Sequence, residues 1–238
     1  MKAMVFAAGL GTRLRPYTND RPKALVEVQG KSLLEITLLR LRAAGVAEVV
    51  VNVHHFADLV SAHLRAHDNF GLTIHLSDER ERLLDTGGAL KKAAPLLSDA
   101  PFLLHNVDIL SDLDLRALYA AHLAHPDALS TLAVRQRKTS RYLEFDEAGL
   151  LAGWKNARTG AQKISRESAL VTDWAYSGIA VIDPRLFAYF PPDEAVFSVV
   201  DVWLDAARTQ AIRNFPHHES RWLDVGKPEA LALAEAEW

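Results

Sequence analysis

The chain has 238 residues, of which 49% are hydrophobic, so it can bury a substantial core as one domain. Its 27 basic and 30 acidic residues argue against a nucleic-acid partner, because long polyanions select a basic surface. Cysteine is absent, which excludes disulfides and thiol chemistry. The sequence shows neither a signal-peptide pattern nor an apolar run long enough to span a bilayer, so we expect a cytoplasmic protein without a membrane partner.

The first distinctive stretch follows residues 2–8, an apolar run with the profile of a strand buried on both faces. Gly9 and Gly11 then turn the chain, and such a turn can direct successive backbone N–H groups at an anion. Arg13 follows directly, and Lys23 precedes the next apolar run. Cations beside a glycine turn at a strand end indicate a polyphosphate site. The stretch is neither a Walker A loop nor a dinucleotide fingerprint, since it lacks both the Gly-Lys-Ser/Thr ending and the third glycine.

Beyond this loop, apolar segments of strand and helix length alternate. The expected strands are 24–28, 48–53, 72–76, 101–104, 129–134, 142–145, 150–154, 175–182 and 222–225, and the expected helices are 33–41, 57–66, 86–97, 117–123, 199–207 and 228–236. The alternation predicts an α/β fold, namely a Rossmann-like three-layer α/β/α sandwich with a mostly parallel, mixed central sheet, in a single domain over residues 1–238. The polar stretch 156–173 is predicted to be an irregular lid or substrate loop.

Two aspartates far apart in the sequence each follow an apolar strand. Asp108 comes after 101–104, and Asp224 lies in the string W-L-D-V-G-K-P. Ligands of doubly wound sheets bind beyond the carboxyl ends of the strands, and Mg²⁺ prefers one or two carboxylates together with water and substrate phosphates. The pair therefore fits one magnesium ion held from two loops, although either aspartate could instead cap the helix or turn that follows it.

Three histidines raise the question of a zinc site. His54 and His55 follow the strand 48–53, and His105 follows 101–104. Nothing else in the sequence suggests a nitrogen-rich metal site, and magnesium takes oxygen ligands. We therefore do not expect a zinc site, and we interpret His54 and His55 as surface histidines, one of which could instead line the base pocket.

The whole N-terminal string, A-G-x-G-T-R-x-x-P-x-T followed by P-K-A-L-V, resembles the signature of the sugar-1-phosphate nucleotidyltransferases, and the short form is similar to their N-acetylmuramate-1-phosphate uridylyltransferase branch. The resemblance implies a nucleotide-binding set of Ala8, Gly9, Gly11, Thr12, Arg13, Lys23, Gly87 and Gly88. Arg13 would stabilise the leaving pyrophosphate, and Lys23 would contact the phosphates near the reacting centre. The two glycines of the Thr86-Gly87-Gly88 loop would let the nucleobase lie against the backbone, while helix capping by Thr86 is the alternative interpretation.

The same resemblance assigns the metal and sugar sites. It makes Asp108 and Asp224 the ligands of a Mg²⁺ cofactor, although Val107 replaces the glycine that usually precedes the first of them. On the sugar side it implies Gly178, which would make room for the ring, and the preceding hairpin offers Glu144, Lys155 and Asn156 as further candidate substrate-binding residues. The usual E-K-P string is absent, so Lys155 is the prediction for the lysine on the sugar phosphate, with Lys163 as the alternative.

These residues together predict transfer of a nucleoside monophosphate from a triphosphate to a sugar-1-phosphate. UTP and N-acetylmuramate-1-phosphate are the first choice of substrates. Guanylyl transfer to a mannose- or heptose-type phosphate, cytidylyl transfer to an amino-alcohol phosphate and a non-catalytic nucleotide-binding regulatory subunit stay open as alternatives. A dehydrogenase is excluded by the cationic loop. The protein is expected to act as a monomer or small homo-oligomer.

Overall fold

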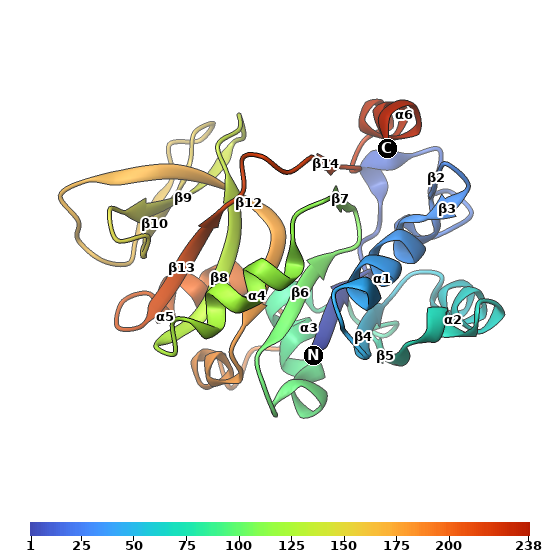
Figure 1. The fold of residues 1–238 in the computed structure, drawn as a ribbon, viewed down its shortest axis with the longest axis horizontal. Coiled ribbons are helices and arrows are strands. Elements are labelled where there is room, and N and C mark those ends of the chain that lie inside the picture. The colour runs from blue at the N-terminus through green and yellow to red at the C-terminus, as the bar shows by residue number, and fades with distance from the viewer. The chain divides into compact units, whose positions relative to one another are not determined.

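The computed structural model describes residues 1–238 and shows two compact units (Figure 1). Unit 1 consists of Met1–Leu84, Leu104–Leu113 and Ser220–Trp238, and unit 2 consists of Asp85–Leu103 and Asp114–Glu219. None of the helices has both the length and the apolar character needed to cross a membrane. The assignment of 1–238 to one domain stays a prediction.

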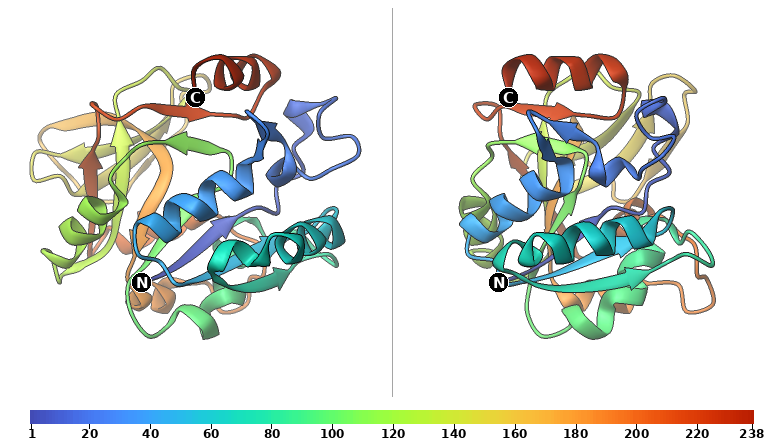
Figure 2. Two further views of the ribbon diagram at one scale, coloured as in Figure 1. Left: turned by 45° about the vertical axis from the view of Figure 1, so that its right-hand side comes forward. Right: turned by 90° about the vertical axis from the view of Figure 1, so that its right-hand side faces the viewer.

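Unit 1 is built on three parallel strands in the order β1, β4, β5. Its elements are β1 (Lys2–Phe6), β2 (Glu27–Val28), β3 (Lys31–Ser32), α1 (Leu33–Ala43), β4 (Glu48–Val53), α2 (Ala57–Ala66), β5 (Thr73–Asp78), β7 (Ile109–Ser111), β14 (Trp222–Asp224) and α6 (Pro228–Glu237), with short 3-10 turns at Thr12–Leu14, Lys23–Leu25 and Asp68–Gly71. The connecting helices α1 and α2 lie alongside the strands (Figure 2). Ser32 caps α1 by accepting a hydrogen bond from the backbone N–H of Glu35 at 3.0 Å.

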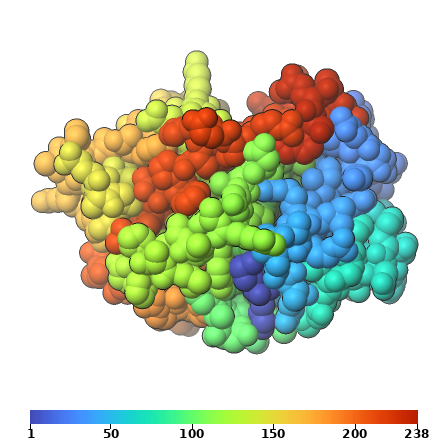
Figure 3. Space-filling view, viewed as in Figure 1, coloured from blue at the N-terminus to red at the C-terminus, as the bar shows by residue number.

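The C-terminal helix α6 packs on the N-terminal part of unit 1. Both carboxylate oxygens of Glu235 accept from the backbone N–H of Gln29 at 3.1 Å. The space-filling view shows these red and blue segments in contact (Figure 3). This helix therefore fixes the segment that carries β14 next to the N-terminal loops.

Unit 2 orders its strands as β11, β10, β9, β12, β8, β13, and all pairs are antiparallel except β8 with β13. Its elements are α3 (Asp85–Leu97), α4 (Leu115–Leu123), β8 (Ala128–Arg135), β9 (Arg141–Asp146), β10 (Leu151–Asn156), β11 (Gln162–Ile164), β12 (Val171–Ile182), a 3-10 turn at Pro184–Tyr189, α5 (Val199–Ala206) and β13 (Ala211–Pro216), and β6 (Phe102–Asn106) runs from unit 2 into unit 1. The predicted α/β fold with a mixed sheet is confirmed, with parallel pairing dominant in unit 1 and antiparallel pairing dominant in unit 2.

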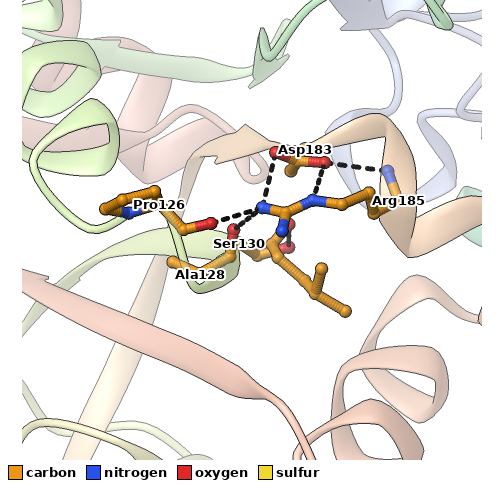
Figure 4. Close-up of polar contacts among 6 residues, drawn as sticks. Pro126, Ala128, Ser130, Asp183 and Arg185 are labelled. Atoms are coloured by element: carbon orange, nitrogen blue, oxygen red, sulfur yellow. Dashed lines mark hydrogen bonds and ion pairs between the residues drawn. The ribbon is translucent and has the colours of Figure 1, made fainter.

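Arg185 fastens the chain where β12 ends (Figure 4). Its guanidinium pairs with Asp183 at 2.8 Å and also donates to the carbonyl of Pro126 at 2.8 Å and that of Ala128 at 3.2 Å. Helix α5 supplies the largest fully buried side chain, Trp203, whose indole N–H donates to Ser130 on β8 at 3.0 Å. These contacts close the core of unit 2 around its central strands.

Two expected elements differ from the structure. The strand expected at 24–28 is wrong in its first half, because the backbone turns there: the N–H of Leu25 donates to the carbonyl of Pro22 and that of Val26 to the carbonyl of Lys23. The stretch 156–173 is not wholly irregular, since it contains β11, which extends the β9–β10 hairpin, and the first residues of β12.

Candidate active site

The N-terminal loop leaves β1 through an anchored turn. The side-chain oxygen of Asn52, at the end of β4, accepts from the backbone N–H groups of Ala7 at 2.7 Å and Ala8 at 3.3 Å. Ala8 was expected to contact the nucleotide, but the structure already uses its N–H inside the protein. The backbone N–H of Ala8 is therefore not available to bind an anion.

The following residues have the properties of an anion-binding turn. Gly9 and Thr12 are exposed, and no hydrogen bond within the protein uses a backbone N–H from 9 to 12. Gly11 has a φ of +64°, and a Cβ there would lie 2.9 Å from the Thr18 side chain. Thr18 also donates to the Gly11 carbonyl at 2.9 Å. Thr18 thus locks a left-handed turn that leaves successive N–H groups available to an anion.

Lys23 and Asp108 form an ion pair. Lys23 is buried, with 10% of its side chain exposed, and the Asp108 side chain is 21% exposed. The turn at the end of β6 places the aspartate, because the N–H of Val107 donates to the carbonyl of Phe6, the last residue of β1, at 3.1 Å. A cation and a carboxylate thus meet directly beside the exit of the N-terminal loop.

Asp224 lies next to the same cluster. Its strand β14 pairs with β7, and the N–H of Val225 donates to the carbonyl of Asp108 at 2.8 Å. A Cβ added at Gly226 would lie 2.7 Å from Asp224 Oδ1 and 3.2 Å from Arg13 Nη2. Arg13 is exposed and makes no ion pair. Unit 1 therefore brings together four of the residues singled out in the sequence, Arg13, Lys23, Asp108 and Asp224.

The donor set of this cluster fits a magnesium ion. Asp108, in the turn before β7, and Asp224, on the neighbouring strand β14, supply hard carboxylate oxygens, the ligand type that Mg²⁺ prefers. The chain contains no group of three or more His, Cys, Asp or Glu side chains suited to a metal. Two carboxylates are enough for magnesium, because it keeps water and substrate phosphates as its other ligands. The assignment of Mg²⁺ stays a proposal.

The histidines do not form a metal centre. His105 is buried, and burial together with the nearby Arg40 charge lowers its pKa to about 3. Its Nδ1 bonds to the carbonyl of Asn106 at 2.8 Å, a hydrogen bond that opposes this lowering, so burial is what keeps the ring neutral. His54 bonds to the carbonyl of Glu79 at 2.6 Å. Both side chains serve the packing of unit 1.

The glycine loop expected to contact the base is tightly packed in unit 2. The carbonyl of Phe197 accepts from the N–H of Gly87 at 2.8 Å and from that of Gly88 at 3.3 Å. A Cβ at Gly87 would lie 2.3 Å from the Phe197 ring. Thr86 accepts from the N–H of Val199 at 3.0 Å. Packing against Phe197 thus accounts for Gly87, and the contact of either glycine with a base stays a prediction.

Asp85, directly before this loop, is a residue that the sequence did not single out. It is exposed, has a left-handed φ of 59° and opens α3, where its carboxylate accepts from the N–H of Thr86 at 2.6 Å. A left-handed φ is uncommon for a non-glycine residue, and aspartate is among the side chains that tolerate it best.

The predicted sugar residues occupy the β9–β10 hairpin of unit 2. Lys155 Nζ lies 2.7 Å from Asp173 and 3.5 Å from Glu144, and the hydrogen bond to Asp173 raises its pKa. Glu144 is 5% exposed and also accepts from Gln162 at 3.2 Å. Two carboxylates thus hold Lys155 in its charged form, and its partly exposed side chain lies beside the buried Glu144.

The other sugar-side predictions fall in different settings. Asn156 uses its side-chain oxygen in a turn, accepting from the N–H groups of Arg158 at 3.0 Å and Thr159 at 3.3 Å. Gly178 has a left-handed φ of 76° within β12, where the pairing with β8 shifts register. Lys163 pairs with Asp201 on α5. Both lysines are thus held in ion pairs, and the choice of Lys155 over Lys163 stays a prediction.

Sequence reasoning missed the pair of buried polar residues behind the N-terminal loop, Asn52 and Glu79. The available signal was one amide in the otherwise apolar strand E-V-V-V-N-V, because a buried polar group needs a partner.

The model of the nucleotidyl transferase family matches residues 2–237. The chain belongs to this family. It is 39% identical over 239 residues to the N-acetylmuramate alpha-1-phosphate uridylyltransferase of Caulobacter vibrioides, over 98% of this chain and 95% of that protein. A protein of the same description from Neisseria meningitidis serogroup B is 38% identical over 130 residues, 55% of this chain and 56% of that protein. The resemblance seen in the N-terminal string is confirmed.

Solved structures share the fold. An inositol-1-phosphate CTP transferase from T. maritima has a TM-score of 0.76 at 18% identity, over 99% of this chain and 96% of that one. A UDP-glucose pyrophosphorylase complexed with UDP-glucose has a TM-score of 0.78 at 17% identity, over 99% and 97% of the two chains.

Proposed function

We propose that this protein transfers UMP from UTP to N-acetylmuramate-1-phosphate, with release of pyrophosphate. The observation that carries the proposal is the arrangement in unit 1, where Lys23 contacts Asp108 and Arg13 lies beside Asp224 next to a turn with unused N–H groups. The choice of substrates rests on the near full-length similarity to the Caulobacter uridylyltransferase.

The reaction needs positioning and charge neutralisation more than acid–base chemistry. An oxygen of the sugar-1-phosphate attacks the α-phosphorus of UTP, a P–O bond forms, and the bond to the pyrophosphate oxygen breaks. The attacking phosphate monoester has a second pKa of about 6, so it is already ionised at neutral pH. The protein therefore has to hold two polyanions in line and neutralise the charge that develops on the leaving group.

Each residue of the cluster has a proposed part in this step. The turn 9–12 binds the triphosphate through its backbone N–H groups, and Arg13 stabilises the departing pyrophosphate. Lys23 contacts the phosphates near the reacting centre, and Asp108 holds its ammonium in place. Asp108 and Asp224 would hold the Mg²⁺, which when bound supplies Lewis-acid polarisation of phosphate oxygens.

The sugar phosphate is assigned to unit 2. Lys155 is the proposed contact for its phosphate, because Asp173 and Glu144 keep this lysine charged and oriented. Gly178 and Asn156 complete the proposed sugar contacts, and Gly87 and Gly88 stay the proposed base loop.

A pyrophosphate-release assay tests the proposal. We expect turnover with UTP and N-acetylmuramate-1-phosphate in the presence of Mg²⁺ to exceed that of the other pairs of triphosphate and sugar-1-phosphate. The panel includes GTP with mannose-1-phosphate, because a Neurospora crassa mannose-1-phosphate guanyltransferase is 35% identical over 145 residues, 60% of this chain. A preference for that pair would replace the uridylyl assignment, and no turnover with any pair would favour the regulatory subunit.

A further inference from the structure

A buried amide and a buried carboxylate connect three segments of unit 1 behind the N-terminal loop. Asn52 is 4% exposed and Glu79 is 2% exposed. Asn52 Nδ2 donates to Glu79 Oε1 at 2.7 Å, and Glu79 Oε2 accepts from the N–H of Leu84 at 3.0 Å. Both side chains are buried, so their polar groups have to be satisfied by each other and by the backbone.

Asn52 sets the direction in which the chain leaves β1. In a strand, successive N–H groups point to opposite sides. The N–H groups of Ala7 and Ala8 instead point to the same acceptor, Asn52 Oδ1, at 2.7 and 3.3 Å. This shared acceptor marks the residue at which the strand ends and the turn begins. The four N–H groups that follow, those of residues 9–12, have no acceptor within the protein.

Glu79 determines which way the amide of Asn52 points. A carboxylate accepts hydrogen bonds and does not donate, so it selects the orientation with Nδ2 toward Glu79 and Oδ1 toward the loop. Glu79 makes no ion pair with a basic side chain, and its second oxygen holds Leu84, the last residue before α3. One carboxylate thus anchors the N-terminal loop and the segment that leads to the proposed base loop.

We propose that Asn52 and Glu79 are positioning residues for triphosphate binding. Asn52 aims the turn 9–12 at the phosphates, and Glu79 holds Asn52 in the one orientation that does so. This inference rests on the proposed binding of UTP by that turn. Neither side chain is exposed, so neither contacts the substrate itself.

The inference is tested by exchanging the amide of Asn52 and the carboxylate of Glu79, first one at a time and then together. In Asn52→Asp two carboxylates face each other, and in Glu79→Gln an amide N–H faces either Asn52 Nδ2 or the Leu84 N–H. In the double variant N52D/E79Q the aspartate accepts from the glutamine, both loop N–H groups keep their acceptor, and Leu84 keeps a carbonyl oxygen. The double variant retains shape, net charge and every hydrogen bond.

We expect each single variant to raise the KM for UTP and the dissociation constant for Mg²⁺-pyrophosphate roughly tenfold, the effect of one lost hydrogen bond to a charged group. The KM for the sugar-1-phosphate should change less than threefold, since that substrate is assigned to unit 2. The double variant should return both constants to within about threefold of the wild type. Thermal unfolding of each variant identifies the temperature at which all are folded, and binding is measured there. Should Asn52→Asp fail to fold, Glu79→Gln and the double variant still decide the question.

Ser77→Ala is the matched control. Ser77 is a buried polar residue on β5, two positions before Glu79, and its hydroxyl makes no hydrogen bond. This variant should leave both constants unchanged. Single variants that bind UTP and pyrophosphate like the wild type, or a double variant no better than the worse single one, would overturn the inference. A wild-type protein that does not bind UTP would overturn the proposed function as well.

Discussion

Replacement of Lys23 by methionine removes the ammonium of the Lys23–Asp108 pair and keeps most of the apolar stem. A preorganised positive charge that contacts the reacting phosphates contributes about 3–4 kcal/mol to transition-state stabilisation. We therefore expect the loss of the Lys23 ammonium to lower kcat roughly 100- to 1000-fold. The assay is pyrophosphate release at saturating substrates. A variant with more than about a tenth of the wild-type rate would refute the role of Lys23.

The same substitution affects stability, and the structure gives the magnitude. The side chains of Lys23 and Asp108 are 10% and 21% exposed, so the pair lies between an exposed pair, worth up to about 1 kcal/mol, and a fully buried one, whose breakage costs 3–5 kcal/mol. We therefore expect Lys23→Met to lower the free energy of unfolding by about 2–3 kcal/mol in urea titrations.

A double variant separates folding from chemistry. Adding Asp108→Asn to Lys23→Met removes the uncompensated carboxylate, so about half of the lost stability should return while kcat stays at least as low. Recovery of activity together with stability would show that Lys23 acts only by supporting the fold.

Three further predictions concern buried positions and the packing around them. Gly87→Ala should destabilise the protein by about 1–3 kcal/mol, because its Cβ would meet the Phe197 ring at 2.3 Å and the Phe197 carbonyl at 2.9 Å. Phe197→Leu should relieve only the part that comes from the ring. A fully stable Gly87→Ala would contradict this origin. His105 has a pKa lowered from 6.5 to about 3, mainly by burial, so the unfolded chain binds a proton that the folded one does not as pH falls below 6.5. Between pH 7.5 and 5 the wild type should lose about 2 kcal/mol more stability than His105→Gln in urea unfolding, and equal losses would reject this origin. Tyr176→Phe should not reduce stability, because the buried hydroxyl has no hydrogen-bond partner; a loss above about 1 kcal/mol would contradict this.

The long segments with regular hydrophobic periodicity were predictable, because the pattern of apolar and polar side chains alone shows which face of the helix or strand is buried. The helix at 57–66 and the strand at 48–53 have the expected bounds. Short pairings were not predictable, since β7 and β11 have three residues each and exist only because β14 and β10 lie beside them. The first turn after Pro22 likewise depends on tertiary contacts of Lys23 rather than on its apolar neighbours.

The charged part of the site was predictable, and its support was not. Arg13 follows a glycine turn, Lys23 precedes an apolar run and Asp108 follows a strand, all of which can be seen in the sequence. Their convergence also required β14 to bring Asp224 beside them, a pairing between segments more than 100 residues apart. Glu79 gave no signal, because a glutamate in a polar stretch is expected to be exposed.

The central claim is that the turn 9–12 binds the phosphates of the triphosphate. Selective labelling with ¹⁵N-glycine gives one amide signal for each of the 12 glycines, which a titration with Mg²⁺ and UTP can follow by NMR. We predict large shifts for Gly9 and Gly11 together with Gly226, which lies beside Arg13 and Asp224, and none for Gly149 or Gly160 in the turns of unit 2. Unchanged signals of Gly9 and Gly11 at saturating UTP would contradict the account.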